Sequence, residues 1–167
     1  MPSKKNGAET RSLFSIFQQP LCLKSSINYY PTRSVNLNLM QTFIHYFLHF
    51  GFPLFFALVF FKKDWKKVYL ILIATMLVDL DHLFADPIFQ ANRCSINFHF
   101  LHSYYAMLLY LGFLFFRRPF NIIGIGLLFH MFTDYIDCMM MFSHCRECLE
   151  DSPAIGPLNW TGNLLGF

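Results

Sequence analysis

Histidine and aspartate recur inside four otherwise apolar stretches of this sequence, and these residue types can bind metal ions or transfer protons. The densest group is Asp79, Asp81 and His82, near the end of the second stretch. A charged side chain in the hydrocarbon of a bilayer costs roughly 2.5 to 3.5 kcal/mol, so such residues usually pair with one another or mark a functional site. The rest of the chain supplies partners of the same types: His45, His49, His99, His102, His130, Asp134 and Asp137.

The spacing of these residues is helical. Side chains three or four residues apart share one face of an α-helix, and this holds for His45/His49, Asp79/His82, His99/His102, His130/Asp134 and Asp134/Asp137. Asp81 follows Asp79 by about 200° of rotation on an α-helix, so it faces elsewhere. We predict that Asp81 orients a ligand or acts as a general base, and that Asp137 is a second catalytic carboxylate. The predicted metal ligands are His45, His49, Asp79, His82, His99, His102, His130 and Asp134.

Imidazole and carboxylate ligands together favour Zn, Mn or non-haem Fe, whereas a soft-metal site would need several cysteines. One metal ion, or two ions about 3.5 to 4 Å apart, both fit this many ligands. A bound divalent ion lowers the pKa of water to about 7 and supplies a nucleophile for hydrolysis. The residues therefore predict a metal-dependent hydrolase. The position of the site near one membrane face suggests a lipid ester or phosphoester as substrate.

The composition predicts that membrane-spanning helices position these residues. Hydrophobic residues make up 55% of the chain and charged residues 14%, whereas soluble proteins are about 25% charged. A net charge of +3, with the basic residues in short clusters, gives no reason to expect a nucleic-acid partner. The four apolar stretches each approach the roughly 20 residues needed to span a bilayer. They predict an all-α, integral membrane four-helix bundle over residues 40–142, with helices at 42–61, 68–86, 98–116 and 120–142.

Proline and polar residues mark the limits of these helices. We expect Pro53 to kink the first helix and Pro87 to end the second, because proline lacks the backbone N–H. Residues 1–39 are polar and irregular and are interpreted as a disordered tail. Alternatively, translation starts at Met40. Residues 143–167 are also predicted to form an irregular tail.

The loops predict an orientation in the membrane. Loops 62–67 and 117–118 are basic, whereas loop 87–97 contains only Arg93. The positive-inside rule makes the two basic loops cytoplasmic, so the histidines and aspartates lie near the opposite face. The basic residues of 1–39 oppose this topology, and a start at Met40 would remove the conflict.

Cysteine and glycine motifs allow further interpretations. Residues 144–148 include a Cys-x-x-Cys spacing, which lacks the full set of zinc ligands, and we favour a loop there. Cys94 and Cys138 both fall near the outer face, where they form a disulfide or remain free thiols. Gly124 and Gly126 favour close helix packing over phosphate binding.

Three other functions use the same residues. A carrier of metal ions or protons would need a polar path to the cytoplasmic side, and the apolar inner halves of the helices argue against it. A bis-histidine haem protein would leave the carboxylates without a role. A non-catalytic membrane protein would use the polar groups only for structure or for partner binding.

Four motifs stand out over residues 40–142: His45-x-x-x-His49-Phe-x-Phe-Pro53, Asp79-Leu-Asp-His-Leu, Arg93-Cys-Ser-Ile-Asn-Phe-His-x-Leu-His-Ser103 and Gly126-Leu-Leu-x-His130-x-x-x-Asp134-x-x-Asp137-Cys138. They resemble a family of small uncharacterised bacterial membrane proteins. They are similar more distantly to inner-membrane metal-dependent hydrolases described as LexA-binding. The resemblance implies a bacterial inner membrane, four helices and a metal-type site facing the periplasm. The wider family has His-Arg-Gly-x-Thr-His-Ser where this chain has His99-Phe-Leu-His102-Ser103, with a shorter histidine spacing.

Overall fold

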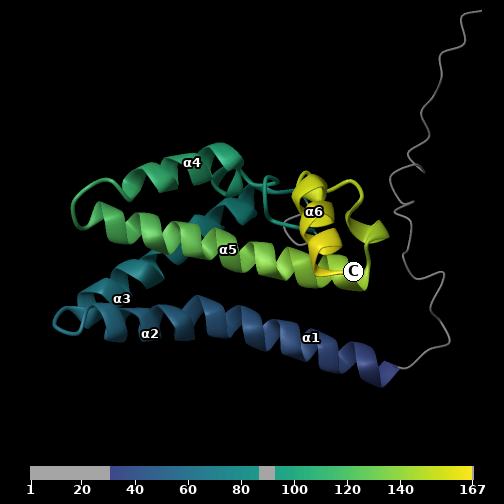
Figure 1. The fold of residues 1–167 in the computed structure, drawn as a ribbon, viewed down its shortest axis with the longest axis horizontal. Coiled ribbons are helices and arrows are strands. Elements are labelled where there is room, and N and C mark those ends of the chain that lie inside the picture. Colours follow the sequence, from purple (N-terminus) through teal and green to yellow (C-terminus); the bar gives the residue numbers. More distant parts are fainter. Residues whose placement is uncertain (1–30, 87–92, 167) are drawn as a thin grey trace, which may run out of the picture. The chain divides into compact units, whose positions relative to one another are not determined.

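The computed structural model describes residues 31–86 and 93–166, and the regular structure in these ranges is helical throughout. The all-α prediction is therefore confirmed for the described part. The first helical rod has three consecutive segments, α1 (Pro31–Tyr46), the π-helical η2 (Phe47–Gly51) and α2 (Phe52–Phe60) (Figure 1). The prediction of an irregular tail is wrong for residues 31–39, because α1 begins at Pro31, a residue favoured in the first helical position. Residues 1–30 lie outside the described ranges.

The π-helical segment lies immediately before Pro53, where the sequence predicts a kink. Proline has no N–H to offer the carbonyl group four residues earlier, which belongs to His49. The helix widens there, and the Phe52 N–H donates to the carbonyl of Phe47, five residues back. Such π-helical turns are frequent at functional sites. In this chain the wide turn contains His49, which is buried.

The second rod combines α3 (Trp65–Ala74) with the 3₁₀ helix η3 (Thr75–Phe84). A 3₁₀ helix has 3.0 residues per turn, so every third side chain lies in one row. Thr75, Val78 and Asp81 form a buried row. Successive residues are about 120° apart in this geometry, so Asp81 lies closer in angle to Asp79 than on an α-helix. Both carboxylates can therefore face the interior.

The third helix is shorter than predicted. The short 3₁₀ segment η4 (Phe100–His102) is followed by α4 (Tyr104–Phe113). Ser103 separates them with extended backbone, and its Oγ accepts a hydrogen bond from the Ala106 N–H as the N-cap of α4. The prediction that His99 and His102 open a helix running from 98 to 116 is therefore wrong. At ten residues, α4 is about 15 Å long and shorter than a bilayer is thick.

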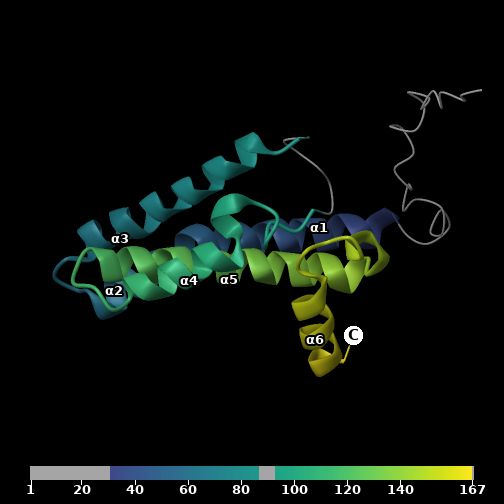
Figure 2. The ribbon, with the colours of Figure 1, turned by 90° about the horizontal axis from the view of Figure 1, so that it is seen from above.

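The fourth predicted helix is present as α5 (Phe120–His144), and it contacts most other elements. α3, η3 and α4 pack against it, as does α6 (Ile155–Leu165) (Figures 1 and 2). A Cβ atom at Gly124 would lie 2.9 Å from the carbonyl oxygen of Tyr110 on α4. At Gly126 it would lie 2.7 Å from Oγ1 of Thr75. Both glycines thus allow close helix packing, as the sequence predicts.

The C-terminal residues are not an irregular tail, which corrects the prediction for 143–167. α6 folds back onto α5, where its Leu158 is fully buried in a cluster that includes Phe142. The hydroxyl of Tyr135 on α5 donates to the carbonyl of Pro157. The sequence of α6 contains two glycines and a proline, which are poor helix formers, so burial of its apolar face stabilises it.

Two helical stretches, Leu39–Phe60 and Phe120–His144, are long and apolar enough to cross a membrane by length and composition. Among the described residues, only these two of the four predicted spans meet that test, because α4 is short and the second rod changes from α to 3₁₀ geometry at Thr75. The Leu39–Phe60 stretch is largely uncovered, with only 17% of its apolar window buried.

Candidate metal centre

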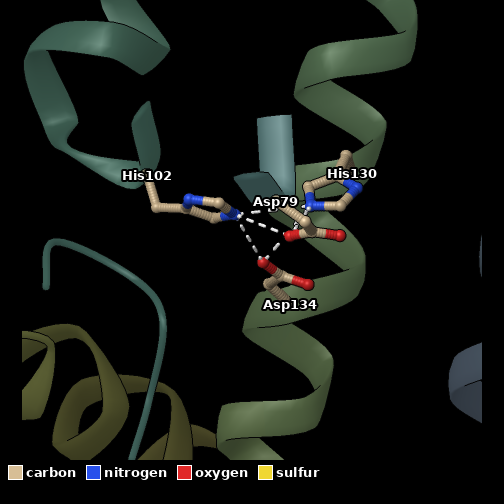
Figure 3. A group of neighbouring side chains, drawn as sticks. All are labelled: Asp79, His102, His130 and Asp134. Carbon is tan, nitrogen blue, oxygen red and sulfur yellow. Dashed lines mark hydrogen bonds and ion pairs between the residues drawn. The ribbon is translucent and has the colours of Figure 1, made fainter. Parts of the chain in front are cut away.

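Four side chains from three separate elements converge on one point (Figure 3). Asp79 comes from η3, His102 from η4, and His130 and Asp134 from successive turns of α5. Each offers one nitrogen or oxygen atom, and these atoms all lie within 4.8 Å of one another. All four belong to the set of ligands predicted from the sequence.

The separations within this group are short. Nε2 of His102 lies 3.4 Å from Nε2 of His130 and 3.1 Å from Oδ2 of Asp134. Oδ1 of Asp79 lies 3.1 Å from Nε2 of His130 and 3.4 Å from Nε2 of His102. Nε2 of His130 lies 3.6 Å from Oδ2 of Asp134. Ligand atoms about 2.0 to 2.1 Å from a tetrahedral zinc ion are separated by about 3.3 Å, so the spacing suits a tetrahedral cation.

The other nitrogen of each central histidine already has an acceptor. Nδ1 of His102 donates to Oδ2 of Asp81 over 3.0 Å, since a carboxylate oxygen only accepts. Nδ1 of His130 lies 3.3 Å from the sulfur of Met76, a weak acceptor. In neutral rings with Nδ1 protonated, Nε2 carries the lone pair. Both lone pairs are therefore available to the common centre, and a carboxylate behind a metal-binding histidine is a recurrent arrangement.

Burial makes this group costly without a cation. His102 and His130 are 0% exposed, and Asp134 is 6% exposed. Oδ2 of Asp134 has no hydrogen-bond partner among the described residues, despite its nearness to two imidazole nitrogens. A buried polar atom without a partner destabilises the fold by about 1 to 3 kcal/mol. The side chain of Asp79 is 45% exposed, so the group is open on one side.

Asp81 is the centre of a second group with His82 and His99, whose ligand atoms also lie within 4.8 Å of one another. Its Oδ1 accepts from Nδ1 of His82 over 3.0 Å. Its Oδ2 accepts from the Leu101 N–H over 2.8 Å, besides the bond from His102. Three donors on one carboxylate indicate that Asp81 orients the neighbouring rings. The predicted ligands His82 and His99 stack on each other with ring centroids 3.9 Å apart, beside the four-residue centre.

The first rod contributes a third group on the other side of α5. Nδ1 of His45 donates to Oδ2 of Asp137 over 2.6 Å, and Nε2 of Gln41 donates to Oδ1 over 3.2 Å. His49 lies between this pair and the centre. Its ring stacks on His45 at 4.2 Å and meets His130 edge-on at 4.7 Å. The predicted catalytic residue Asp137 thus pairs with His45 in a cleft of about 360 Å³.

A disulfide and a backbone hydrogen bond hold the loop that carries His102. Cys94 is joined to Cys138 on α5, one turn beyond Asp134. Asn97 adopts a left-handed conformation with φ of 58°, which asparagine tolerates better than most residues. Its N–H donates to the carbonyl of His102 over 2.9 Å. The loop is thereby closed upon itself and attached to the helix that supplies two ligands. A second disulfide links Cys145 to Cys148, so these thiols are not metal ligands.

Sequence reasoning missed three side chains at these groups, namely Met76, Ser95 and Gln41. Met76 precedes Asp79 by three residues and Gln41 precedes His45 by four, so helical spacing could have found both. Ser95, whose Oγ lies 3.1 Å from Nε2 of His82, belongs to a loop without periodicity. No local pattern identifies it.

An open groove of about 720 Å³ adjoins the Asp81 group. Asp81, Asp86 and His99 supply its polar edge. Its other walls are apolar: Leu77, Leu80, Phe84, Phe98, Phe100 and Leu101. A smaller cavity of about 230 Å³ lies between α2, α3 and α5 next to Met76, and it is lined by apolar groups.

Comparison with known proteins yields one family. A sequence profile of DUF6122, described as a family of unknown function, matches residues 39–141, which is more than half of the chain. No curated protein and no solved structure matches the chain. The matched range contains all ten of the histidines and aspartates predicted as site residues.

Proposed function

We propose that this chain, which belongs to the DUF6122 family of unknown function, is a membrane-bound metalloprotein that hydrolyses an ester or phosphoester. The observation that carries the proposal is the convergence of Asp79, His102, His130 and Asp134, whose ligand atoms all lie within 4.8 Å of one another, with five of the six pairs at 3.1 to 3.6 Å. Both imidazoles direct an Nε2 lone pair to the shared centre, and one buried carboxylate oxygen there has no other partner. A divalent cation at this centre would accept both imidazole lone pairs and would give the buried carboxylate oxygen of Asp134 a partner.

The ligand set favours Zn, Mn or Fe, because two imidazoles and two carboxylates are intermediate in softness. A metal ion bound there would lower the pKa of a coordinated water to about 7. Asp79 is the ligand on the open side of the centre, so its carboxylate is the one placed to meet incoming water. Asp81 holds His102 by its Nδ1, and we assign it an orienting role.

A membrane location is supported by what the helices expose. Leu39–Phe60 spans 22 residues, about 33 Å of helix, against about 30 Å of hydrocarbon. Its side chains Phe43, Phe55 and Phe60 are each at least 60% exposed. Soluble proteins rarely expose apolar patches of this extent. We propose a multi-pass protein in the bacterial inner membrane, the location that the resemblance implies.

The proposed orientation has basic loops 62–67 and 117–118 in the cytoplasm and the metal centre towards the periplasm. The two disulfides support this orientation independently of charge. Cys94–Cys138 and Cys145–Cys148 both belong to segments on the side of the centre opposite the basic loops. Disulfides persist in the periplasm and are rare in the cytosol.

The groove beside Asp81 favours a lipid as substrate. Its apolar walls suit an acyl chain, while Asp81, Asp86 and His99 offer polar contacts for a headgroup. A lipid could therefore keep its chain in apolar surroundings while its ester or phosphoester lies against Asp81 and His99, beside the four-residue centre. We propose a membrane lipid ester or phosphoester as the substrate class.

The alternatives receive less support. A carrier would need polar groups leading away from the centre, but the cavity beside Met76 is apolar and Gly126 packs against Thr75. A bis-histidine haem would need a gap for the porphyrin, whereas Nε2 of His102 and of His130 are 3.4 Å apart. A purely structural role would leave Oδ2 of Asp134 buried without compensation.

Elemental analysis of the full chain purified in mild detergent tests the proposal. We expect stoichiometric divalent metal that is lost in His130→Ala and Asp79→Asn variants. Metal-loaded protein should then release phosphate or fatty acid from mixed phospholipid micelles, and the His130→Ala protein should not. Absence of bound metal after loading with Zn, Mn and Fe in turn would reject the metal centre. Bound metal without hydrolysis of any lipid ester would reject the enzymatic part.

A further inference from the structure

His49 has one ring nitrogen, Nε2, that forms no hydrogen bond with any described residue. The side chain is 4% exposed, and its Nε2 is buried without a hydrogen-bond partner. Its Nδ1 donates to the carbonyl of His45 over 3.1 Å, because a carbonyl oxygen only accepts. In the neutral ring the lone pair is therefore on Nε2, directed into the interior. An imidazole held in this way has the form of a metal ligand that lies outside the four-residue centre.

The nearest acidic atom to this nitrogen is the second oxygen of Asp134. Nε2 of His49 lies 3.8 Å from Oδ1 of Asp134, while Oδ2 of the same carboxylate faces His102 and His130. Two ligand atoms about 2.1 Å from one ion lie at most about 4.2 Å apart. An ion thus fits between His49 and Oδ1, on the opposite side of the carboxylate from the first centre.

We propose that Asp134 bridges two metal ions and that His49 is a terminal ligand of the second. The inference rests on the proposed function, since the first ion must occupy the other oxygen of Asp134. Two ions about 3.5 to 4 Å apart are common in enzymes that hydrolyse phosphoesters, where they stabilise the attacking and leaving oxygens. A second ion would therefore point to a phosphoester among the substrates considered.

The His45–Asp137 pair lies next to His49, on the side away from the first centre. Asp137 accepts a hydrogen bond from Nδ1 of His45, just as Asp81 accepts one from Nδ1 of His102. Because Nδ1 of the neutral ring has the proton, the lone pair of His45 is on Nε2. His45 and His49 are four residues apart and stacked on one helix face, a spacing found in helical zinc sites. The pair borders a cleft of about 360 Å³ with Gln41 and Tyr46, so water can reach His45, the neighbour of His49.

Metal counting distinguishes one ion from two. The full chain in mild detergent is loaded with Mn²⁺, freed of excess and analysed for manganese per chain. We expect two ions in the wild type, one in His49→Gln and fewer than one in Asp134→Asn, which removes the shared carboxylate. His144→Gln is the matched control, because His144 is exposed at the end of α5 and should retain two.

The wild-type protein alone provides a second readout that needs no variant. Two Mn²⁺ ions bridged by one carboxylate are magnetically coupled, so the electron paramagnetic resonance spectrum should differ from that of isolated Mn²⁺. One ion in the wild type with an uncoupled spectrum would overturn the second position and leave the proposed function intact. Two ions retained by His49→Gln would also overturn it. No bound ion in any protein would reject both proposals.

Discussion

Nδ1 of His102 donates to Oδ2 of Asp81 over 3.0 Å, and both side chains are buried. This bond sets the orientation of a ring that comes from a loop rather than from a regular helix. Asp81 in turn belongs to the buried row of η3. A residue that contacts no metal itself thus determines where the Nε2 atom of a proposed ligand lies.

Replacing Asp81 by Asn should weaken metal binding by about 10- to 100-fold, because partners behind ligating histidines contribute that much. The amide lacks the charge and cannot accept equally well from three donors. Affinity is measured by competition with a chromophoric chelator. Asp151→Asn changes an exposed aspartate far along the chain and should bind as the wild type does. Equal affinity in both variants would argue against the orienting role.

Removing the Cys94–Cys138 disulfide should lower both stability and metal affinity. The bond closes 44 residues and ties the His102 loop to α5, and loss of such a bond costs about 2 to 4 kcal/mol. The double variant Cys94→Ser and Cys138→Ser is compared by thermal unfolding and by metal content. The matched control replaces Cys145 and Cys148, which are three residues apart. That control should change little, and an equal loss in both proteins would contradict the prediction.

Gly126→Ala should destabilise the fold by about 1 to 3 kcal/mol, the usual cost of overpacking. The added Cβ would lie 2.7 Å from Oγ1 of Thr75, so η3 and α5 would have to separate. Gly112→Ala provides the comparison, since nothing lies within 4 Å of a Cβ there and alanine favours a helix by about 1 kcal/mol. Thermal unfolding in detergent should show a lowered melting temperature for Gly126→Ala and no such loss for Gly112→Ala.

The proposed topology predicts that a reporter enzyme fused in loop 62–67 lies in the cytoplasm, whereas one fused after Leu165 lies in the periplasm. Alkaline phosphatase fused within loop 62–67 should be inactive, because it folds only in an oxidising compartment. The same enzyme fused after Leu165 should be active if the disulfide-bearing side faces the periplasm. Activity is measured in intact bacteria. The reverse pattern would place the metal centre on the cytoplasmic side.

Features that depend on neighbours along the chain could be predicted from the order of the residues alone. The helices predicted at 42–61 and 120–142 follow from apolar length, and helical segments are present over 42–60 and 120–142. His130 and Asp134 are four residues apart on one regular helix, so their shared face in α5 could be predicted. The high share of hydrophobic residues and the low share of charged residues, gathered in stretches of about 20 residues, likewise predicted an all-helical protein.

Which polar residues meet depends on tertiary packing. η3 is a 3₁₀ helix, and the change from about 100° to about 120° per residue places Asp81 in its buried row and leaves Asp79 on the open side of the centre. His102 reaches the centre from a loop held by Asn97 and the Cys94–Cys138 bond. Ligand distances depend on how elements far apart in the sequence pack together, and burial and cross-links control that packing. Helical periodicity contains no information about burial or cross-links. It therefore predicted ten site residues, of which packing brings four to one point.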